Sequence, residues 1–472
     1  MRRLIAISNR VQVDHEGETA NRGGLAVALA AALRESNGIW FGWSGELTEE
    51  FTGQITFRRA EGVATATIDL EAQDIEEYYN GFANRTLWPL FHYRLDLTEI
   101  ARDYAGGYAR VNSRFADTVG PLIEPDDLIW VHDYHLMPLG QQLRERGFDN
   151  RIGFFLHTPW PPPSLLVSLP DHRKLVESLL SYDVIGFHSH EWRQAFMDYV
   201  TAHLDARLEG DRVIFGGRSS LLLICPIGLD TEEFCAAAGT PAAVEAETRL
   251  IHSAVGKAVI VGVDRLDYSK GLQERFSAYE LLLTTRPELR EKVFLLQIAP
   301  PSRGDVPSYQ QIRAELNSLS GSINGEFAAT DWVPVRYVNK GYSRDQLFGI
   351  YRASRVGLIT PLRDGMNLVA KEYVAAQDPA DPGVLVLSCF AGAAAQLTSA
   401  VIVNPHSTED MADGIARALA MPLSERRARH KAMLECVEKE DVRWWSKRFM
   451  EALIAEDAAV GPARSPADAA QE

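Results

Sequence analysis

The sequence has few cysteines, and their spacing argues against two kinds of site. Cys225, Cys235, Cys389 and Cys436 are the only four in 472 residues, and no two of them form a Cys-x-x-Cys pair. A zinc site and a disulfide framework are therefore both unexpected. We predict reduced cysteines that pack as small apolar side chains.

Basic residues are also fewer than acidic ones. Lys and Arg number 48 against 64 Asp and Glu, so the net charge is −16. An acidic chain does not bind nucleic acid through a broad basic face, and we expect no nucleic-acid partner. Any anionic ligand must then be held by a few well-placed Arg and Lys side chains.

No apolar run is long enough to cross a membrane. The longest, residues 25–33, has nine residues, about half of the ~18 that a transmembrane helix needs. The N-terminal apolar stretch turns polar at Ser8, too early for the ~7–15-residue apolar region of a secretory signal. We therefore expect a cytoplasmic protein with no membrane partner.

Three ligand-binding motifs of other enzyme classes are missing. The sequence has no G-x-G-x-x-G, which disfavours a dehydrogenase, and no G-x-x-x-x-G-K-[ST] phosphate loop. It also has no Asp-x-Asp, so a metal that clamps a diphosphate would lack obvious ligands. We expect no metal and no required cofactor, with any diphosphate neutralised by cationic side chains and helix amides.

What is present is the composition of an ordinary globular protein, with 46% hydrophobic and 24% charged residues. At roughly 150 residues per domain, the length corresponds to two or three domains.

Short β-branched runs alternate with amphipathic helical stretches, which predicts βαβ units and parallel sheets. The expected strands are 4–8, 128–132, 152–157, 184–188, 221–227, 258–263, 293–298, 356–360, 384–388 and 400–403. The expected helices are 25–34, 137–146, 191–200, 272–285, 309–319, 345–353, 369–377 and 407–420. One series in each half predicts an α/β protein with two Rossmann-like domains that face each other across a cleft. We place these domains at residues 1–235 and 236–456, and a disordered tail at 457–472.

Polar residues follow several strands of the first half, at the edge where parallel sheets bind ligands. Asp133 stands after one strand between histidines, and could bind sugar hydroxyls or move a proton. His157 ends another strand, either as part of a site or as a satisfied core histidine. Gly23 and Gly24 precede a helix, where their amides suit an anion, although such a pair also makes an ordinary turn.

The second half repeats this pattern with more charge. Arg265 and Lys270 lie five residues apart after a strand, and two cations on one loop favour a phosphate or diphosphate. Asp364 ends a further strand, and a helix begins near Asn367 with free amides that suit a pyrophosphate. Glu372 follows on that helix, where it could reach a ribose diol.

Long motifs contain these residues and carry a family resemblance. They are Ser8-Asn9-Arg10, Gly23-Gly24-Leu25-Ala26-Val27, Glu77-Tyr78-Tyr79-Asn80, Leu87-Trp88-Pro89, His132-Asp133-Tyr134-His135-Leu136, Arg265-Leu266-Asp267-Tyr268-Ser269-Lys270-Gly271, Ser302-Arg303-Gly304-Asp305 and Arg363-Asp364-Gly365-Met366-Asn367-Leu368-Val369-Ala370-Lys371-Glu372. From Leu4 to about Ala455 the chain resembles the trehalose-6-phosphate synthases, retaining glycosyltransferases of GT-B type with two Rossmann domains.

The resemblance implies transfer of glucose from UDP-glucose to glucose 6-phosphate by a homodimer or homotetramer, giving α,α-trehalose 6-phosphate and UDP. By motif position it assigns the acceptor phosphate to Arg10, Tyr79, Trp88 and Arg303, and the acceptor sugar to Asp133. Because all four phosphate residues are present, glucose 6-phosphate is the expected acceptor.

On the donor side, the resemblance assigns Arg265 and Lys270 to the diphosphate, and His157 and Asp364 to glucose hydroxyls. The other donor residues that it implies are Gly23, Gly24, Tyr342 at the nucleotide, Leu368, Val369, Ala370, Lys371 and Glu372 at the ribose. The expected catalytic residues are Asp133, His157, Arg265, Lys270 and Asp364. With no carboxylate left over as a nucleophile, retention favours attack on the face from which UDP departs.

Three other interpretations remain open. One is a synthase of the same fold with another acceptor, such as a glycerol phosphate. The second is a phosphorylase-like enzyme with pyridoxal phosphate, and the third is a catalytically silent sugar-phosphate sensor. Thr158 and the loop Trp160-Pro161-Pro162-Pro163 depart from the family's pattern beside the donor sugar, and the sequence leaves UDP, ADP and GDP open as the donor nucleotide.

Overall fold

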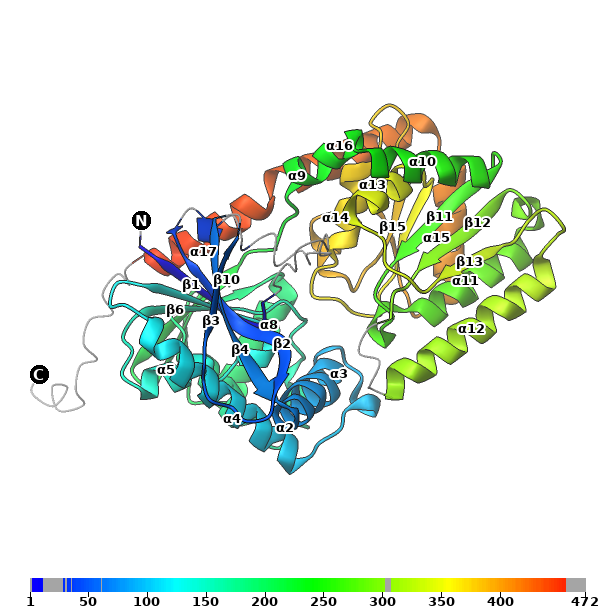
Figure 1. Cartoon of the computed structure of the whole chain (residues 1–472). Helices are drawn as coiled ribbons and strands as arrows, with labels where there is room; N and C mark the ends of the chain where they lie inside the picture. The colour runs from blue at the N-terminus through cyan, green and yellow to red at the C-terminus, as the bar shows by residue number, and fades with distance from the viewer. Residues whose placement is uncertain are drawn as a thin grey trace, which may run out of the picture.

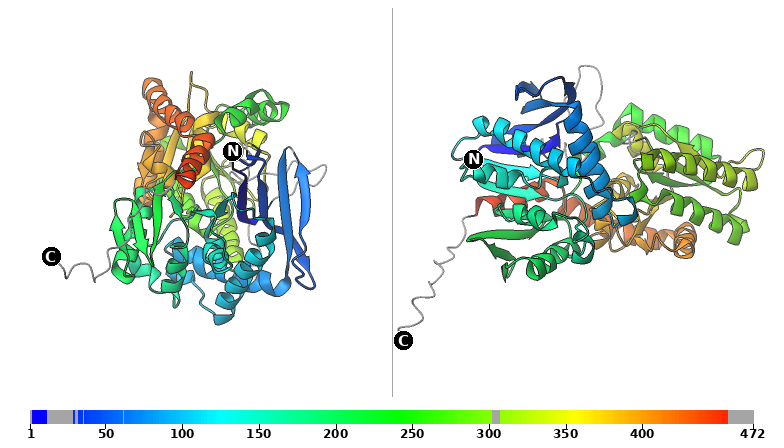
Figure 2. Two further views of the ribbon diagram at one scale, coloured as in Figure 1. Left: turned by 90° about the vertical axis from the view of Figure 1, so that its left-hand side faces the viewer. Right: turned by 90° about the horizontal axis from the view of Figure 1, so that it is seen from below.

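A computed structural model shows two lobes side by side, each built around a mainly parallel β-sheet (Figures 1 and 2). It describes residues 2–11, 29, 32–34, 36–60, 62–301 and 307–455. The two sheets confirm the predicted α/β architecture with two Rossmann-like domains.

The sheet of the first lobe has ten strands within the described residues, in the order β3-β4-β2-β1-β5-β6-β7-β10-β9-β8. Neighbours from β4 to β10 are parallel, while β3 at one edge and β9 and β8 at the other are antiparallel additions. The strands are β1 (Leu4–Arg10), β2 (Ile39–Thr48), β3 (Thr56–Ala60), β4 (Val63–Glu71), β5 (Leu128–His132), β6 (Arg151–Phe155), β7 (Val184–Phe187), β8 (Arg207–Glu209), β9 (Arg212–Phe215) and β10 (Arg218–Ile224).

The central strands β1 and β5 read as nearly unbroken apolar runs because both faces of the sheet are covered. All residues of β5 are buried, and so are all of β1 except Arg10. The helices of this lobe are α2 (Ala72–Asp74), η1 (Ile75–Leu87), α3 (Trp88–Phe91), η2 (Leu95–Leu97), α4 (Arg102–Val119), η3 (Gly120–Leu122), η4 (Tyr134–Leu136), α5 (Leu139–Glu145), α6 (Pro163–Leu166), α7 (His172–Leu179) and α8 (His190–His203).

The described part of the second lobe has a six-stranded sheet that is parallel throughout, in the order β13-β12-β11-β14-β15-β16. Its strands are β11 (Ala258–Val263), β12 (Val293–Ile298), β13 (Val335–Val338), β14 (Val356–Ile359), β15 (Val384–Ser388) and β16 (Val401–Val403). Its helices are α9 (Thr231–Ala236), η5 (Ala237–Gly239), α10 (Pro241–Ala254), η6 (Tyr268–Lys270), α11 (Leu272–Thr285), η7 (Pro287–Leu289), α12 (Pro307–Phe327), α13 (Arg344–Arg352), α14 (Leu368–Ala376), η8 (Gly392–Ala395), α15 (Thr408–Ala420) and α16 (Leu423–Lys439). Figure 1 shows α10, α13, α14 and α16 over one face of this sheet and α11 and α12 on the other.

The chain passes between the lobes twice, and the two passages lie side by side. It leaves the first lobe after β10 and returns to it between α16 and α17 (Val442–Ile454), the last helix within the described residues. The Val442 N–H donates to the Leu229 carbonyl at 3.1 Å. A methyl group on Gly228 would meet the Asp441 backbone at 2.2 Å, so the passages touch at their backbones.

Helix α17 packs on the sheet of the first lobe, as Figure 1 shows. Its Phe449 stacks on Trp130 with ring centroids 4.4 Å apart and lies against Gly153 of β6 and Gly186 of β7. The two glycines are needed because a methyl group on either would lie 3.0 Å or less from that ring. Helix α17 therefore completes the core of the first lobe.

Most of the predicted elements are confirmed. The bounds of strands 128–132, 258–263, 293–298 and 384–388 and of helix 272–285 match, and most others shift by one to three residues. The predicted tail and most of helix 25–34 lie outside the described residues. The domain division at residue 235 falls in α9 and stays a prediction, with α17 lying on the first sheet although the division places it in the second domain.

Candidate active site

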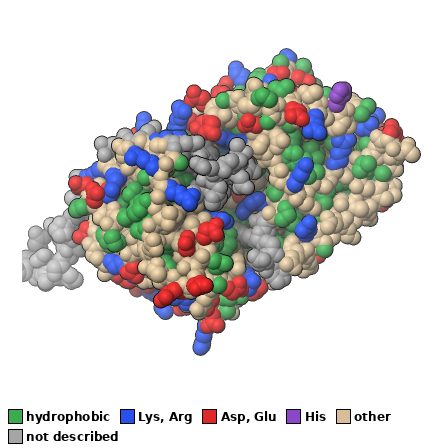
Figure 3. Space-filling model, in the orientation of Figure 1, with side chains coloured by type: hydrophobic (Ala, Val, Ile, Leu, Met, Phe, Trp, Pro, Cys, Tyr) green, Lys and Arg blue, Asp and Glu red, His purple; other side chains and the backbone are tan. Residues whose placement is uncertain are grey.

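A cavity of about 410 Å³ lies between the lobes, and both contribute to its wall. The first lobe supplies Asp133, His157, His188 and Ile227. The second supplies Val263, Asp264, Arg265, Lys270, Asp364, Met366, Asn367, Leu368, Val369 and Glu372. Figure 3 shows Lys and Arg side chains beside the hollow between the lobes.

The cavity forms at the carboxyl ends of strands in both sheets. Asp133 directly follows β5, and His157 comes two residues after β6. Asp264 and Arg265 directly follow β11. Because parallel strands end at one edge of a sheet, and the two edges face each other, residues far apart in sequence line one site.

Asp133 is held in a strained backbone conformation. Its φ is +73°, a backbone conformation that residues other than glycine rarely adopt, and strain of this kind clusters at functional sites. Its Oδ1 accepts a hydrogen bond from the His157 N–H at 3.1 Å, and its own N–H donates to the Phe155 carbonyl at 2.8 Å. Asp133 and His157 are thus held together at the rim of the first sheet.

Burial keeps His132 and His157, two histidines at this rim, neutral near pH 7. His132 Nδ1 lies 3.2 Å from His157 Nε2, within hydrogen-bond distance. Burial lowers the pKa of His157 to about 3, and burial together with His157 lowers the pKa of His132 well below its usual value. His157 can therefore bind a hydroxyl through a neutral ring nitrogen, but it is not an acid near pH 7.

Across the cavity, Asp364 and Lys270 form an ion pair. The Lys270 Nζ lies 2.5 Å from Asp364 Oδ2, which also accepts a hydrogen bond from Asn367 Nδ2 at 3.1 Å. Burial acts to raise the pKa of Asp364, but the Lys270 ammonium outweighs it and holds that pKa below its usual value. The carboxylate stays charged and accepts hydrogen bonds.

The N-terminus of α14 opens onto the same cavity. The chain enters the helix at Asn367, whose φ is +76°, and Leu368 and Val369 line the wall. The first amides of a helix have no partner within the helix, so they suit a diphosphate.

The side chains of Ala370 and Lys371 are buried and do not line the cavity. The Lys371 Nζ donates to the Ile227 carbonyl at 2.7 Å, and burial lowers its pKa to about 8. The prediction that these residues serve the donor can thus hold only for their backbone, because the Lys371 ammonium binds the passage between the lobes.

Glu372 lines the cavity one turn into α14. Its Oε2 accepts a hydrogen bond from the Tyr351 hydroxyl at 3.3 Å. Burial raises the pKa of this carboxyl group, and Arg344 and Tyr351 reduce that rise. Its position next to the helix N-terminus suits a diol beside a bound diphosphate.

Arg265 reaches across to the first lobe. The Arg265 guanidinium lies over the Trp88 ring at 5.7 Å from its centroid. In the opposite direction, Arg94 of the first lobe lies over the Tyr268 ring at 5.6 Å. The predicted diphosphate ligand Arg265 and the predicted acceptor residue Trp88 therefore meet in space.

A second cluster extends from Trp88 into the first lobe. Trp88 contacts Tyr134, with centroids 5.7 Å apart, and Tyr134 contacts His135 at 4.0 Å. His135 stacks on Tyr79 at 5.9 Å. The chain of contacts ends with Trp43, which packs against Tyr79 at 5.7 Å and lies under the Arg10 guanidinium at 5.6 Å. The structure thus brings Arg10, Tyr79 and Trp88 into one group.

His135, one of the two histidines that flank Asp133, belongs to this group, and so does Trp43, which was not among the predicted site residues. β1 and β2 are parallel neighbours, and their register pairs Arg10 with Trp43. A Trp at the end of the apolar run 39–43 was the available signal, because parallel neighbours end at the same edge.

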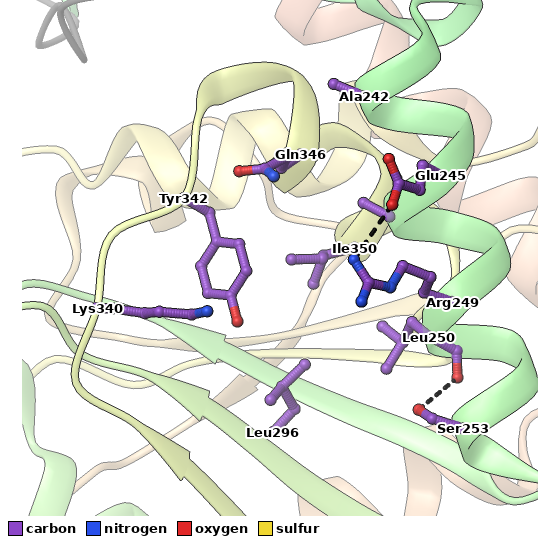
Figure 4. Close-up of a pocket in the computed structure, with 11 residues that line it drawn as sticks. Ala242, Glu245, Arg249, Leu250, Ser253, Leu296, Lys340, Tyr342, Gln346 and Ile350 are labelled. Atoms are coloured by element: carbon purple, nitrogen blue, oxygen red, sulfur yellow. Dashed lines mark hydrogen bonds and ion pairs between the residues drawn. The ribbon is translucent and has the colours of Figure 1, made fainter.

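Three predicted residues, Gly23, Gly24 and Arg303, lie outside the described residues. Tyr342 is not part of the lining of the cleft cavity. It lines another cavity, of about 400 Å³, between α10 and the segment that leads to α13 (Figure 4). Lys340 lies over its ring there, at 5.2 Å from the centroid.

Two negative findings apply to the described residues. No three His, Cys, Asp or Glu side chains in the described ranges are grouped so that they could hold a metal ion. In the same part of the chain, every helix is too short or too polar to cross a membrane.

The chain is similar to known glycosyltransferases over almost its whole length. The sequence model of glycosyltransferase family 20 matches residues 3–455. A trehalose-6-phosphate synthase of Klebsiella pneumoniae is 48% identical over 96% of this chain and 95% of its own length.

Solved structures with bound ligands are similar too. An α,α-trehalose-phosphate synthase (UDP-forming) from Burkholderia xenovorans in complex with glucose-6-phosphate is 47% identical, with a TM-score of 0.91 over 96% of this chain and 100% of that one. A structure from E. coli bound with UDP-2-fluoro glucose is 45% identical, with a TM-score of 0.91 over 96% of this chain and 98% of that one.

Proposed function

This chain belongs to glycosyltransferase family 20, and from that membership and the cleft we infer that it is a trehalose-6-phosphate synthase. It transfers glucose from UDP-glucose to glucose 6-phosphate, which gives α,α-trehalose 6-phosphate and UDP. The observation that carries this inference is the contact of Arg265 with Trp88, because it joins a cationic diphosphate site in one lobe to an aromatic cluster in the other.

We propose that the donor lies against the second lobe. Arg265 and Lys270 bind the diphosphate of UDP-glucose, with the first amides of α14 and the backbone of Gly23 and Gly24. Glu372 binds the ribose, and Tyr342 contacts the nucleotide. Asp364 and the neutral His157 bind hydroxyls of the transferred glucose, a role supported by their position in the cavity wall.

The acceptor lies against the first lobe in this proposal. Arg10, Tyr79, Trp88 and Arg303 bind the phosphate of glucose 6-phosphate, and Asp133 binds its sugar. Support comes from the aromatic contacts that bring Arg10, Tyr79 and Trp88 together and from the cation at one end of that group.

We propose front-face attack for the chemical step. The bond from the anomeric carbon to the UDP oxygen breaks, and an acceptor hydroxyl attacks from the same face and passes its proton to that oxygen. Lys270 and Arg265 stabilise the charge that develops on the departing diphosphate. Asp133 and Asp364 act as hydrogen-bond acceptors, which is consistent with their hydrogen bonds to the His157 N–H and to Lys270.

The remaining proposals concern the whole enzyme. We propose that it works in the cytoplasm as a homodimer or homotetramer and requires no metal or other cofactor. Sedimentation of the purified protein at several concentrations measures the oligomeric state. A mass equal to one chain at every concentration would refute the proposed homo-oligomer.

An endpoint assay by mass spectrometry tests the activity. Purified protein is mixed with glucose 6-phosphate and, in parallel, UDP-, ADP- or GDP-glucose, with EDTA present. We expect a nonreducing disaccharide phosphate from UDP-glucose. Nucleotide release without this product would redirect the search to another acceptor, such as glycerol phosphate, and no release with or without magnesium would overturn the inference.

A further inference from the structure

His188 lines the cleft cavity, although neither its strand-end position nor the family resemblance had assigned it a role. It directly follows β7 and is 3% exposed. Its ring centroid lies 5.5 Å from that of His157 and 5.0 Å from that of Phe155. It therefore stands beside His157, on the wall that the first lobe presents to the donor sugar.

The hydrogen bond to Nδ1 determines which nitrogen of His188 carries the proton. The Ile227 N–H donates to His188 Nδ1 at 3.2 Å, so Nδ1 is an acceptor. Burial lowers the pKa of His188 well below its usual value, with smaller contributions from His157 and Lys371, so the ring is neutral. A neutral imidazole whose Nδ1 accepts must carry its proton on Nε2.

This Nε2–H is buried and has no hydrogen-bond partner among the described residues. A buried donor without a partner is unfavourable, and native proteins rarely keep one without a reason. A ligand hydroxyl that enters the cavity can supply the missing acceptor.

Ile227, whose N–H orients His188, is held from the second lobe through its carbonyl. The Ile227 carbonyl accepts the hydrogen bond of Lys371 Nζ at 2.7 Å, and Lys371 is 1% exposed. Lys371 belongs to α14, whose first residues line the same cavity. Ile227 thus links the helix whose first residues line the cavity to the ring of His188, which lines it from the first lobe.

We propose that the Nε2–H of His188 donates a hydrogen bond to a hydroxyl of the transferred hexose and thereby selects the donor sugar. This proposal rests on the proposed function. A site built around a hydrogen bond to a substrate hydroxyl discriminates strongly against analogues that lack it. His188 is then a specificity-determining residue, and Lys371 and Ile227 are positioning residues.

Two substitutions test the roles of the two ring nitrogens of His188 separately. His188→Asn keeps an acceptor near the place of Nδ1 for the Ile227 N–H and removes the donor at Nε2. His188→Gln places an amide N–H near Nε2. His252→Asn, on the exposed face of α10, is the matched control.

The affinities of UDP and UDP-glucose, measured by calorimetry, give the readout. We expect His188→Asn to weaken UDP-glucose about 10- to 100-fold, the range for one buried hydrogen bond, with UDP unchanged. His188→Gln should recover most of the loss, and His252→Asn should match the parent. In kinetics, kcat/KM for UDP-glucose should fall with KM for glucose 6-phosphate unchanged.

Donor analogues then identify the hydroxyl. UDP-xylose lacks the hydroxymethyl group, and UDP-galactose and UDP-mannose invert single hydroxyls. The analogue that lacks or inverts the hydroxyl bound by His188 should bind the parent and His188→Asn equally well. Equal weakening of UDP and UDP-glucose, or no weakening of either, would overturn the role of His188. Product formation by the parent with UDP-glucose distinguishes that result from failure of the proposed function itself.

Discussion

At the scale of single residues, Lys270 is placed to serve two anions. It forms an ion pair with Asp364 within the cleft, and it lies on the loop that we propose as the diphosphate site. Both side chains are mostly buried, with 11% and 13% exposed. Loss of the ammonium therefore affects the leaving group and also the charge of the carboxylate.

We expect Lys270→Ala to lower kcat by about 10²–10³-fold, the scale for removing one preorganised group that stabilises developing charge. The pKa of Asp364 should also rise, because burial then acts without the opposing cation. The acid limb of the pH–rate profile should move to higher pH. Steady-state kinetics from pH 5 to 9 measure both effects, with exposed Lys431→Ala on α16 as control. An unchanged kcat would contradict the assignment.

Arg10 is the cation at the far end of the aromatic group. Arg10→Ala should raise KM for glucose 6-phosphate at least about tenfold, since a charge-assisted hydrogen bond to phosphate is lost. KM for UDP-glucose should change little. Arg58→Ala, an exposed arginine of β3, provides the comparison. If the acceptor KM stayed the same, Arg10 would not belong to the phosphate site.

At the scale of elements, α17 packs in the first lobe although it follows the whole second lobe in the sequence. Phe449 is fully buried over Trp130 and the two glycines of β6 and β7. Phe449→Ala should lower the free energy of unfolding by about 3–5 kcal/mol, the usual cost of emptying a buried aromatic site. Urea unfolding measures it, and Lys447→Ala on the exposed side of the same helix should have almost no effect. Equal stabilities of the two variants would exclude this packing.

Helix α14 contains a buried cation that makes stability depend on pH. The pKa of Lys371 is about 8 in the folded protein against 10.5 unfolded, so between these values the unfolded chain binds more protons. The free energy of unfolding should therefore rise with pH across this window, by about 3 kcal/mol in total. Lys371→Met should lack this contribution. Urea unfolding of both proteins at pH 7.5 and 10.5 gives the difference, and a difference that does not change with pH would contradict the burial of the ammonium.

The elements of the second lobe were the easiest to predict from sequence. β11, β12 and β15 are buried on both faces, so they appear as short β-branched runs with clear ends. β2 was harder, because two glycines and two tryptophans interrupt its run and its second half is polar. β4 does contain a β-branched pattern, with Val63, Thr65, Thr67 and Ile68 in nine residues, and was still not among the predicted strands. β3 and η1 contain no β-branched or helical pattern of comparable length.

Parts of the site could not be predicted, because they depend on contacts between residues far apart in the sequence. Residues at strand ends, such as Asp133 and Asp364, could be found because the end of an apolar run marks the edge of a sheet. The role of His188 depends on a hydrogen bond to Ile227, 39 residues further along the chain. Local sequence contains no signal for such a contact, nor for the direction of the Lys371 side chain.

At the scale of the whole molecule, the two lobes meet backbone to backbone beside the reaction site. A methyl group on Gly365 of the second lobe would lie 2.0 Å from the His157 carbonyl oxygen of the first. Glycine is required here for close approach, because any side chain would hold the lobes apart. The spacing of the lobes and the geometry of His157 and Asp364 are therefore coupled.

We expect Gly365→Ala to reduce kcat/KM by about 10²-fold or more, because displacements near 1 Å in an active site cost that much. Small-angle scattering should show a larger radius of gyration with both substrates bound. Gly106→Ala is the control, since a methyl group there would meet no atom within 4 Å. Full activity of Gly365→Ala would mean that the lobes need not approach this closely.

The return of the chain through α17 has a consequence for the order of folding during synthesis. A ribosome makes the whole second lobe before it reaches residues 442–454. Until then the surface of the first lobe that α17 covers, at Gly153, Gly186 and Trp130, stays exposed. Exposed apolar surface of this kind makes nascent chains prone to aggregation and dependent on chaperones. Chains stalled after residue 441 should therefore be cut by proteases in the first lobe, whereas chains stalled far enough beyond residue 455 for α17 to emerge should resist.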